Sequence, residues 1–142
     1  MNASSRSLEN APVNVRIKLA ALWTSVMFCY IYADYFGLYV PGKLEAMIAG
    51  RMRPIGPVTQ GLLVGTSAML AIPALMIALS VLLGPRLSRI LNIVFGFLYT
   101  AIIFVTMWGW SFYILYGVIE NTLTLLVVWY AWRWPRAEPA GS

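Results

Sequence analysis

Two acidic residues, Asp34 and Glu120, lie within apolar segments that are long enough to cross a membrane. A carboxyl group inside a hydrophobic span costs about 2.5 to 3.5 kcal/mol, so each acid needs a partner, a water-filled cavity or a proton. With a helical rise of about 1.5 Å per residue, Asp34 lies about 9 Å and Glu120 about 13 Å from the same membrane surface. The two acids are therefore the first candidates for chemistry in this chain.

Hydroxyl side chains accompany both acids. Tyr30 lies one helical turn before Asp34, and the third apolar segment supplies Tyr99 and Thr100. The helical neighbours of Glu120 are Tyr113, Tyr116 and Thr124. If these faces converge, they form an outward-opening pocket in which desolvation and repulsion leave one acid neutral, or leave the two sharing a proton. The alternative, in which each acid merely hydrogen-bonds a tyrosine or threonine across the bundle, stays open.

Missing residue types exclude several kinds of mechanism. The sequence contains no histidine and one cysteine, Cys29. Sites with histidine ligands, paired-cysteine redox centres, and Ser-His or Cys-His nucleophiles are thereby excluded. We expect no metal and no cofactor, and no enzyme class follows from the sequence. Cys29 lies inside the first apolar segment and is expected to be a small buried hydrophobe.

Composition places the chain in a membrane. Hydrophobic residues make up 61% of it and charged residues 11%, and the mean hydropathy is +0.77. Apolar runs of about 20 residues match a hydrocarbon core of about 30 Å. They predict an all-α, integral membrane four-helix bundle with helices at about 16–40, 58–83, 87–108 and 111–134. The bundle is expected over 15–136, between disordered cytoplasmic tails at 1–14 and 137–142.

A tight turn must separate the third and fourth helices. Residues 90–132 carry one acid and no base. As a single helix they would run about 65 Å, twice the thickness of the hydrocarbon core. We place the reversal at 108–111, because Gly109 relaxes the backbone there and the flanking Trp108 and Trp110 suit the headgroup level.

Basic residues predict the orientation. Three of them, Lys43, Arg51 and Arg53, fall on one side of the membrane, and seven fall on the other: Arg6, Arg16, Lys18, Arg86, Arg89, Arg133 and Arg136. The positive-inside rule then gives a multi-pass protein of the bacterial inner membrane with both termini in the cytoplasm. The excess of base is accordingly topological and does not indicate nucleic acid. Residues 1–14 lack the features of a signal peptide, so we expect the first helix to be retained.

The connection at about 41–57 and the second helix carry packing signals. Apolar residues at helical spacing predict a short helix near 43–52, which lies on the outer leaflet or, alternatively, covers a substrate cavity. In the second helix Gly61 and Gly65 form a GxxxG pattern, and we expect this face to pack within the bundle rather than against another subunit. Pro73 predicts a kink in the same helix.

Several strings resemble a known family. They are Tyr30-Ile31-Tyr32-Ala33-Asp34, Pro41-Gly42, Ile119-Glu120 and Trp129-Tyr130-Ala131-Trp132-Arg133-Trp134-Pro135. Over about 15–136 the chain resembles a domain-of-unknown-function family of small bacterial four-helix integral membrane proteins, and it is more distantly similar to the DoxX-like membrane proteins. The resemblance implies a compact four-helix bundle and no established activity. It carries over Asp34 and Glu120 as candidate positions, whose roles rest on physical grounds.

Three functions remain open. The one that we favour is binding or transport of a cationic or proton-coupled small molecule in an outward-opening cavity around Asp34 and Glu120. The second is a structural or accessory role, in which the GxxxG face docks another membrane protein or a second copy of the chain. The third is an intramembrane acid/base enzyme that acts on a lipophilic substrate. Composition itself implies one partner, the lipid bilayer.

Overall fold

Four long helices dominate the structure. The computed structural model describes residues 11–135. The long helices are α1 (Val15–Gly37), α3 (Gln60–Leu82), α4 (Pro85–Thr106) and α5 (Ser111–Trp132). Between α1 and α3 lie the short helix α2 (Lys43–Ile48) and the antiparallel strands β1 (Arg51–Met52) and β2 (Gly56–Pro57). The predicted four-helix bundle is confirmed, and the predicted disordered tails lie outside the described residues, apart from 11–14.

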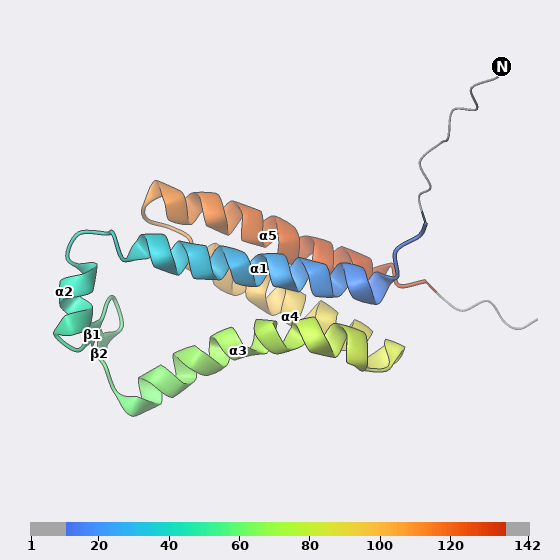
Figure 1. Cartoon of the computed structure of the whole chain (residues 1–142), viewed down its shortest axis with the longest axis horizontal. Coiled ribbons are helices and arrows are strands. Elements are labelled where there is room, and N and C mark those ends of the chain that lie inside the picture. Colours follow the sequence, from blue (N-terminus) through green and yellow to red (C-terminus); the bar gives the residue numbers. More distant parts are fainter. Residues whose placement is uncertain (1–10, 136–142) are drawn as a thin grey trace, which may run out of the picture.

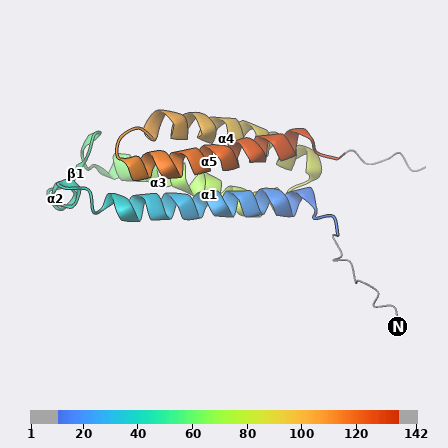
Figure 2. The same cartoon turned by 90° about the horizontal axis from the view of Figure 1, so that it is seen from above.

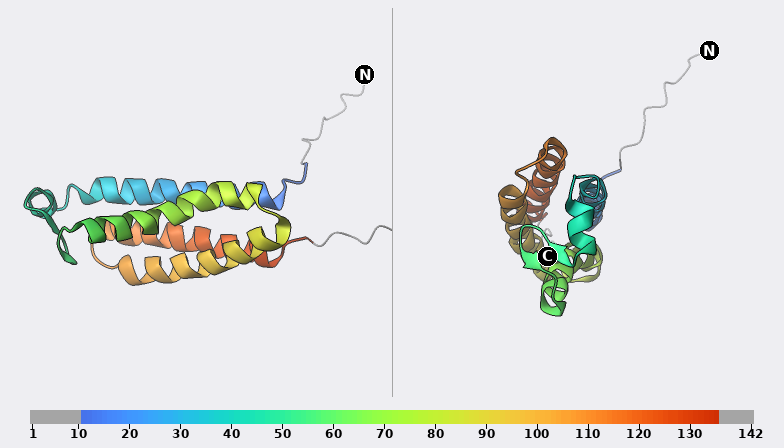
Figure 3. Two further views of the ribbon diagram at one scale, coloured as in Figure 1. Left: turned by 90° about the horizontal axis from the view of Figure 1, so that it is seen from below. Right: turned by 90° about the vertical axis from the view of Figure 1, so that its left-hand side faces the viewer.

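The long helices run side by side along one axis (Figures 1 and 2). Figure 3 shows α2 and the β1–β2 hairpin together at one end, which we call the α2 end; α1 begins and α5 ends at the opposite, terminal end. α5 lies against α1 and α4, whereas α3 packs mainly on α1. α3 bends near its middle, the part that contains Pro73, and diverges from the other helices toward its N-terminus (Figure 1).

Local sequence sets the helix ends. Asn14 and Thr59 cap α1 and α3, because their side chains accept hydrogen bonds of 2.9 and 3.1 Å from backbone N–H groups of the first turn. α4 begins at Pro85, where the missing N–H costs nothing. α1 ends at Gly37, three residues before the predicted end. Ahead of Pro41, successive backbone N–H groups donate to the carbonyl three residues earlier instead of four, so the helix does not continue.

Glycines help to shape two other predicted segments, the short helix near 43–52 and the turn at 108–111. The helix predicted near 43–52 stops at Ile48, because Gly50 adopts a left-handed φ of 68° and the β1–β2 hairpin follows. The turn predicted at 108–111 is confirmed. There α4 ends at Thr106, α5 begins at Ser111, and Gly109 has a φ of 150°.

The long helices expose apolar faces. Each of the four has 22 or 23 residues and is apolar enough to cross a membrane. Large hydrophobic side chains remain exposed along them, among them Ile31, Val64, Leu75, Val105 and Leu115. Because water does not tolerate such continuous apolar faces, lipid must cover them. The chain is a multi-pass membrane protein.

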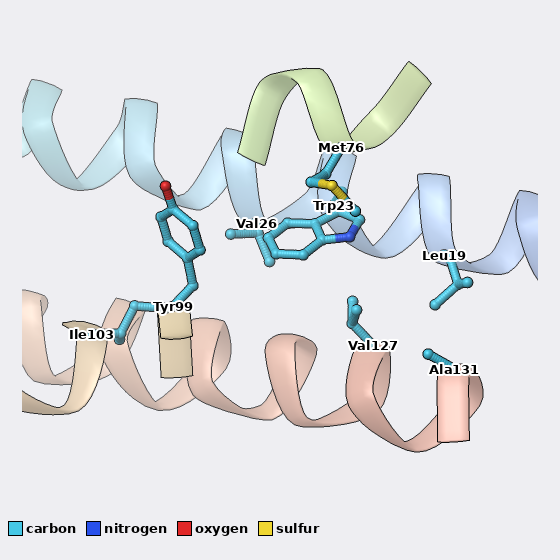
Figure 4. Close-up of a cluster of buried hydrophobic side chains, with 8 residues drawn as sticks. All are labelled: Leu19, Trp23, Val26, Met76, Tyr99, Ile103, Val127 and Ala131. Carbon is cyan, nitrogen blue, oxygen red and sulfur yellow. The ribbon is translucent and has the colours of Figure 1, made fainter. Parts of the chain in front are cut away.

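Most of the buried core lies in the half of the bundle nearer the terminal end, and Tyr99 and Ile103 continue it toward the α2 end. Figure 4 shows side chains from all four long helices in one cluster: Leu19, Trp23, Val26, Met76, Tyr99, Ile103, Val127 and Ala131. Beside it, Trp23 Nε1 donates to Asn92 Oδ1 at 2.8 Å, and Ser80 Oγ donates to the same oxygen at 3.1 Å. These three residues are fully buried, so their polar groups satisfy one another away from lipid.

Close packing of α4 on α5 uses Gly96, a glycine without a motif in the sequence. At Gly96 of α4, a Cβ would lie 2.7 Å from a side-chain atom of α5, and one turn away Thr100 Oγ1 donates to Thr124 Oγ1 at 2.7 Å. By contrast, Gly61 and Gly65 are exposed, and a Cβ placed there would meet no described atom of another helix within 4 Å. The expectation that the GxxxG face packs within the bundle is wrong, because α3 diverges from its neighbours over those turns.

Candidate functional site

A cavity of about 790 Å³ occupies the half of the bundle next to the α2 end. The long helices contribute wall residues between 30 and 34 (α1), 63 and 70 (α3), 99 and 106 (α4), and 113 and 120 (α5). α2 and the hairpin add further lining residues. The space exists because α3 diverges from α4 and α5 in this half of the bundle (Figure 1). Most of the lining is apolar, with two acids and three bases as exceptions.

Glu120 is the buried acid of this cavity. It lies on the buried face of α5, between Gly117 and Thr124, and is 5% exposed. Its Oε1 atom is buried and has no hydrogen-bond partner among the described residues. Thr124 Oγ1 donates to the main-chain carbonyl of Glu120 at 3.0 Å rather than to the carboxyl group. The cross-bundle hydrogen bond of the alternative interpretation is therefore not formed at Oε1.

Asp34 lines the same cavity from α1. Unlike Glu120 it is exposed, as a carboxyl group near a hydrated membrane surface can be. Asp34 lies on α1 and Glu120 on α5, so the two acids line the cavity from different helices. The structure thus brings both acids to one cavity, while their part in binding stays a prediction.

The predicted hydroxyl residues divide into two groups. Tyr30, Tyr113 and Tyr116 line the cavity, as does Tyr99, whereas Thr124 does not. Thr124 is fully buried and joins α4 to α5 through Thr100, so its role is structural.

Tyr99 also has a structural task, because its hydroxyl donates to the main-chain carbonyl of Met69. That carbonyl would normally accept a hydrogen bond from the N–H four residues later, at Pro73. Proline has no N–H, so the Tyr99 hydroxyl replaces the missing helical hydrogen bond. The kink predicted from Pro73 is in this way accommodated by a residue that the sequence analysis assigned to the pocket.

Lys43 of α2 reaches Tyr113 of α5 at the rim of the cavity. Its Nζ donates to the Tyr113 hydroxyl at 2.8 Å and lies 5.6 Å from the centre of the ring. Both groups occupy the space above Gly37, where a Cβ would lie 2.6 Å from Nζ and would overlap the hydroxyl. A glycine at the end of α1 therefore allows this cross-link between α2 and α5.

Three basic residues of the lining were missed as site residues: Lys43, Arg51 and Arg53. In the sequence these three residues serve as orientation signals. Their place in the chain could have revealed them, because they follow the Asp34 helix at the membrane surface to which both acids are nearest. α2 also lends Ala46 and Met47 to the lining, as a cover over the cavity requires, and its Ile48 is 81% exposed, as an interfacial helix requires.

Fold and cavity together define a four-span membrane protein with an acid buried in one half of its bundle. Among residues 11–135, no cluster of acidic or cysteine side chains could hold a metal ion. The family model of DUF6326, described as a family of unknown function, matches residues 11–141, so the chain belongs to this family. Comparisons with curated proteins and with solved structures found no match. Function must therefore be inferred from the cavity.

Proposed function

We propose that this protein binds a small amphiphilic molecule in its cavity, as a receptor or as part of a transport process. We further propose that it resides in a bacterial inner membrane with both termini in the cytoplasm, so that the cavity opens outward. One observation carries the proposal: Glu120 is buried at the wall of a roomy cavity with a carboxyl oxygen that no described residue satisfies.

A buried polar atom without a hydrogen bond costs about 1 to 3 kcal/mol, and more when it is charged. A ligand that donates an ammonium or hydroxyl group to Glu120 would offset this cost. The apolar wall, with Met69 and Ile103, would hold the remainder of such a ligand. Binding therefore accounts for both the size of the cavity and the unsatisfied acid.

A second function has one observation in its favour. The GxxxG face of α3, with Gly61 and Gly65, is exposed, and small residues let a second helix approach closely. Docking of another membrane protein would cover this face. It would leave the cavity and Glu120 unexplained, so we rank it below ligand binding.

Thiol labelling tests whether the cavity admits water-soluble molecules. The Glu120→Cys variant is made in a Cys29→Ala background, purified and placed in lipid discs, where a membrane-impermeant maleimide reaches both faces. We expect labelling at a rate between those of two controls in the same background, Ile48→Cys on exposed α2 and Val127→Cys in the packed core. Labelling as slow as that of the core control, in a variant that melts normally, would contradict the proposal.

A further inference from the structure

Charges of opposite sign line different depths of the cavity. The bases Lys43, Arg51 and Arg53 come from α2 and the hairpin, at the α2 end. The acids come from the walls of the bundle. Figure 3 shows α2 and the hairpin beyond the ends of the long helices, so an entering molecule at this end meets the bases before the acids.

The spacing between these charges can be read along α5. Lys43 Nζ is anchored at the Tyr113 hydroxyl, and Glu120 lies seven residues further along the same helix. Two helical turns correspond to about 10 Å. Asp34 lies three residues before Gly37, which contacts Lys43, so it sits about 4.5 Å inward from the ammonium group. The sequence of charges from the α2 end is thus base, Asp34 and then Glu120.

This order disfavours ligands of a single charge. A purely cationic molecule would be repelled by the three bases, and a purely anionic one would be repelled by the acids. Most of the remaining lining is apolar and includes Ala33, Met69 and Ile103. A molecule that matches this lining carries an anionic group for the bases at one end and a hydrogen-bond donor for the acids at the other. An apolar chain joins the two ends.

We propose that the ligand is a dipolar amphiphile whose anionic group, a carboxylate or phosphate, binds Lys43, Arg51 and Arg53 while an ammonium group about 10 Å away binds Glu120. The inference rests on the proposed binding function and adds the ligand class. An ammonium group bound at Glu120 donates a charge-assisted hydrogen bond and satisfies Oε1.

A chain-length series tests this spacing. The wild-type protein in phosphatidylcholine discs is titrated by calorimetry with 4-aminobutanoate, 8-aminooctanoate and 12-aminododecanoate, and with octanoate and octylamine as one-ended controls. We expect 8-aminooctanoate to bind most tightly, by about tenfold over either one-ended control, which is the scale of one charge-assisted hydrogen bond. Equal affinities for the two-ended and one-ended probes, or affinities that simply rise with chain length, would overturn the ligand class.

Substitutions test which residues bind the ammonium end and which bind the anionic end of the ligand. Glu120→Gln should reduce the affinity for 8-aminooctanoate to the affinity for octanoate, and it should leave the affinity for octanoate unchanged. The Arg51→Gln/Arg53→Gln double variant should reduce the affinity for 8-aminooctanoate to the affinity for octylamine. Glu120→Asp and Arg53→Lys keep the charges and should retain the preference for the two-ended probe. If phosphatidylglycerol in the discs abolishes binding of every probe, the bases bind a lipid headgroup and the ligand class is wrong.

The thiol-labelling experiment distinguishes a failure of the dipolar ligand class from a failure of the proposed binding function. If Glu120→Cys is labelled but no probe shows the two-ended preference, the cavity remains a binding site and the dipolar ligand is rejected. If Glu120→Cys also stays unlabelled, both proposals fall together.

Discussion

At the scale of single residues, the polar atoms inside this bundle are satisfied with few exceptions. Asn92 links Trp23 and Ser80 in the packed half, and Tyr99 covers the carbonyl that Pro73 leaves free. Two atoms depart from this pattern, since neither Glu120 Oε1 nor Asn121 Oδ1 has a partner among the described residues. Of the two residues, Glu120 is ionisable and lines the cavity, and an ionisable residue inside a membrane span marks a functional position.

Replacing Tyr99→Phe should lower the free energy of unfolding by about 1 kcal/mol, because the Met69 carbonyl loses its partner. In a Pro73→Ala background the same replacement should cost less, since the alanine N–H can bond that carbonyl within the helix. Steric trapping in lipid discs measures the free energy of unfolding for the four proteins. Equal costs in the two backgrounds would show that the hydroxyl does not cover this carbonyl.

At the scale of elements, the two parts of α3 belong to different halves of the bundle, one packed and one containing the cavity. Its C-terminal part lends Met76 to the core and Ser80 to the Asn92 network, while its N-terminal part lines the cavity with Leu63 and Thr66. α4 and α5 stay together throughout, because Gly96 permits close approach and the two threonines bond across the interface. One diverging helix against a fixed pair therefore creates the cavity.

Glycine substitutions test whether the α4–α5 contact, rather than the GxxxG face of α3, holds the bundle together. Gly96→Ala should lower the free energy of unfolding by about 1 to 3 kcal/mol, since its methyl group overlaps Val128, a β-branched side chain with little freedom to move. Gly65→Ala is the matched control and should cause no loss, because its surroundings are open. The reverse order of costs would show that the GxxxG face, rather than the α4–α5 contact, holds the bundle together. If Gly65→Ala instead changes the oligomeric state, the exposed face is an interface.

At the scale of the whole molecule, basic residues have different tasks at the two ends. At the terminal end Arg16 donates to the carbonyl of Val81, and Arg89 donates to the carbonyls of Ala131 and Trp132, so each caps the C-terminus of a helix. At the α2 end the bases line the cavity. The charge difference that predicts orientation thus also distinguishes a closed end from an open one.

Orientation can be measured with the same thiol chemistry in intact cells. In a Cys29→Ala background, Ile48→Cys on α2 should react with an impermeant reagent added outside. Gly84→Cys, between α3 and α4 near the terminal end, should react once the cells are permeabilised and not before. The opposite pattern would place α2 in the cytoplasm and contradict the outward opening of the cavity, without affecting binding in lipid discs.

The sequence by itself determined the number of spans, their approximate ends and the turn at Gly109. Apolar length and the cost of an unpaired backbone in lipid leave few alternatives for such a chain. It also singled out Asp34 and Glu120, because acids inside a hydrophobic span are rare for the same reason. These inferences depend on properties local to each segment.

The tertiary structure alone decided which small residues pack, which tyrosine is structural and which residue Lys43 contacts. The GxxxG pattern of α3 is the stronger local signal, but the path of α3 leaves it exposed, and the single Gly96 of α4 makes the close contact instead. Likewise, nothing near Tyr99 in the sequence connects it to Pro73, and nothing near Lys43 connects it to Tyr113. These contacts join segments 30 and 70 residues apart, so they depend on how the helices cross and not on the composition of any one helix.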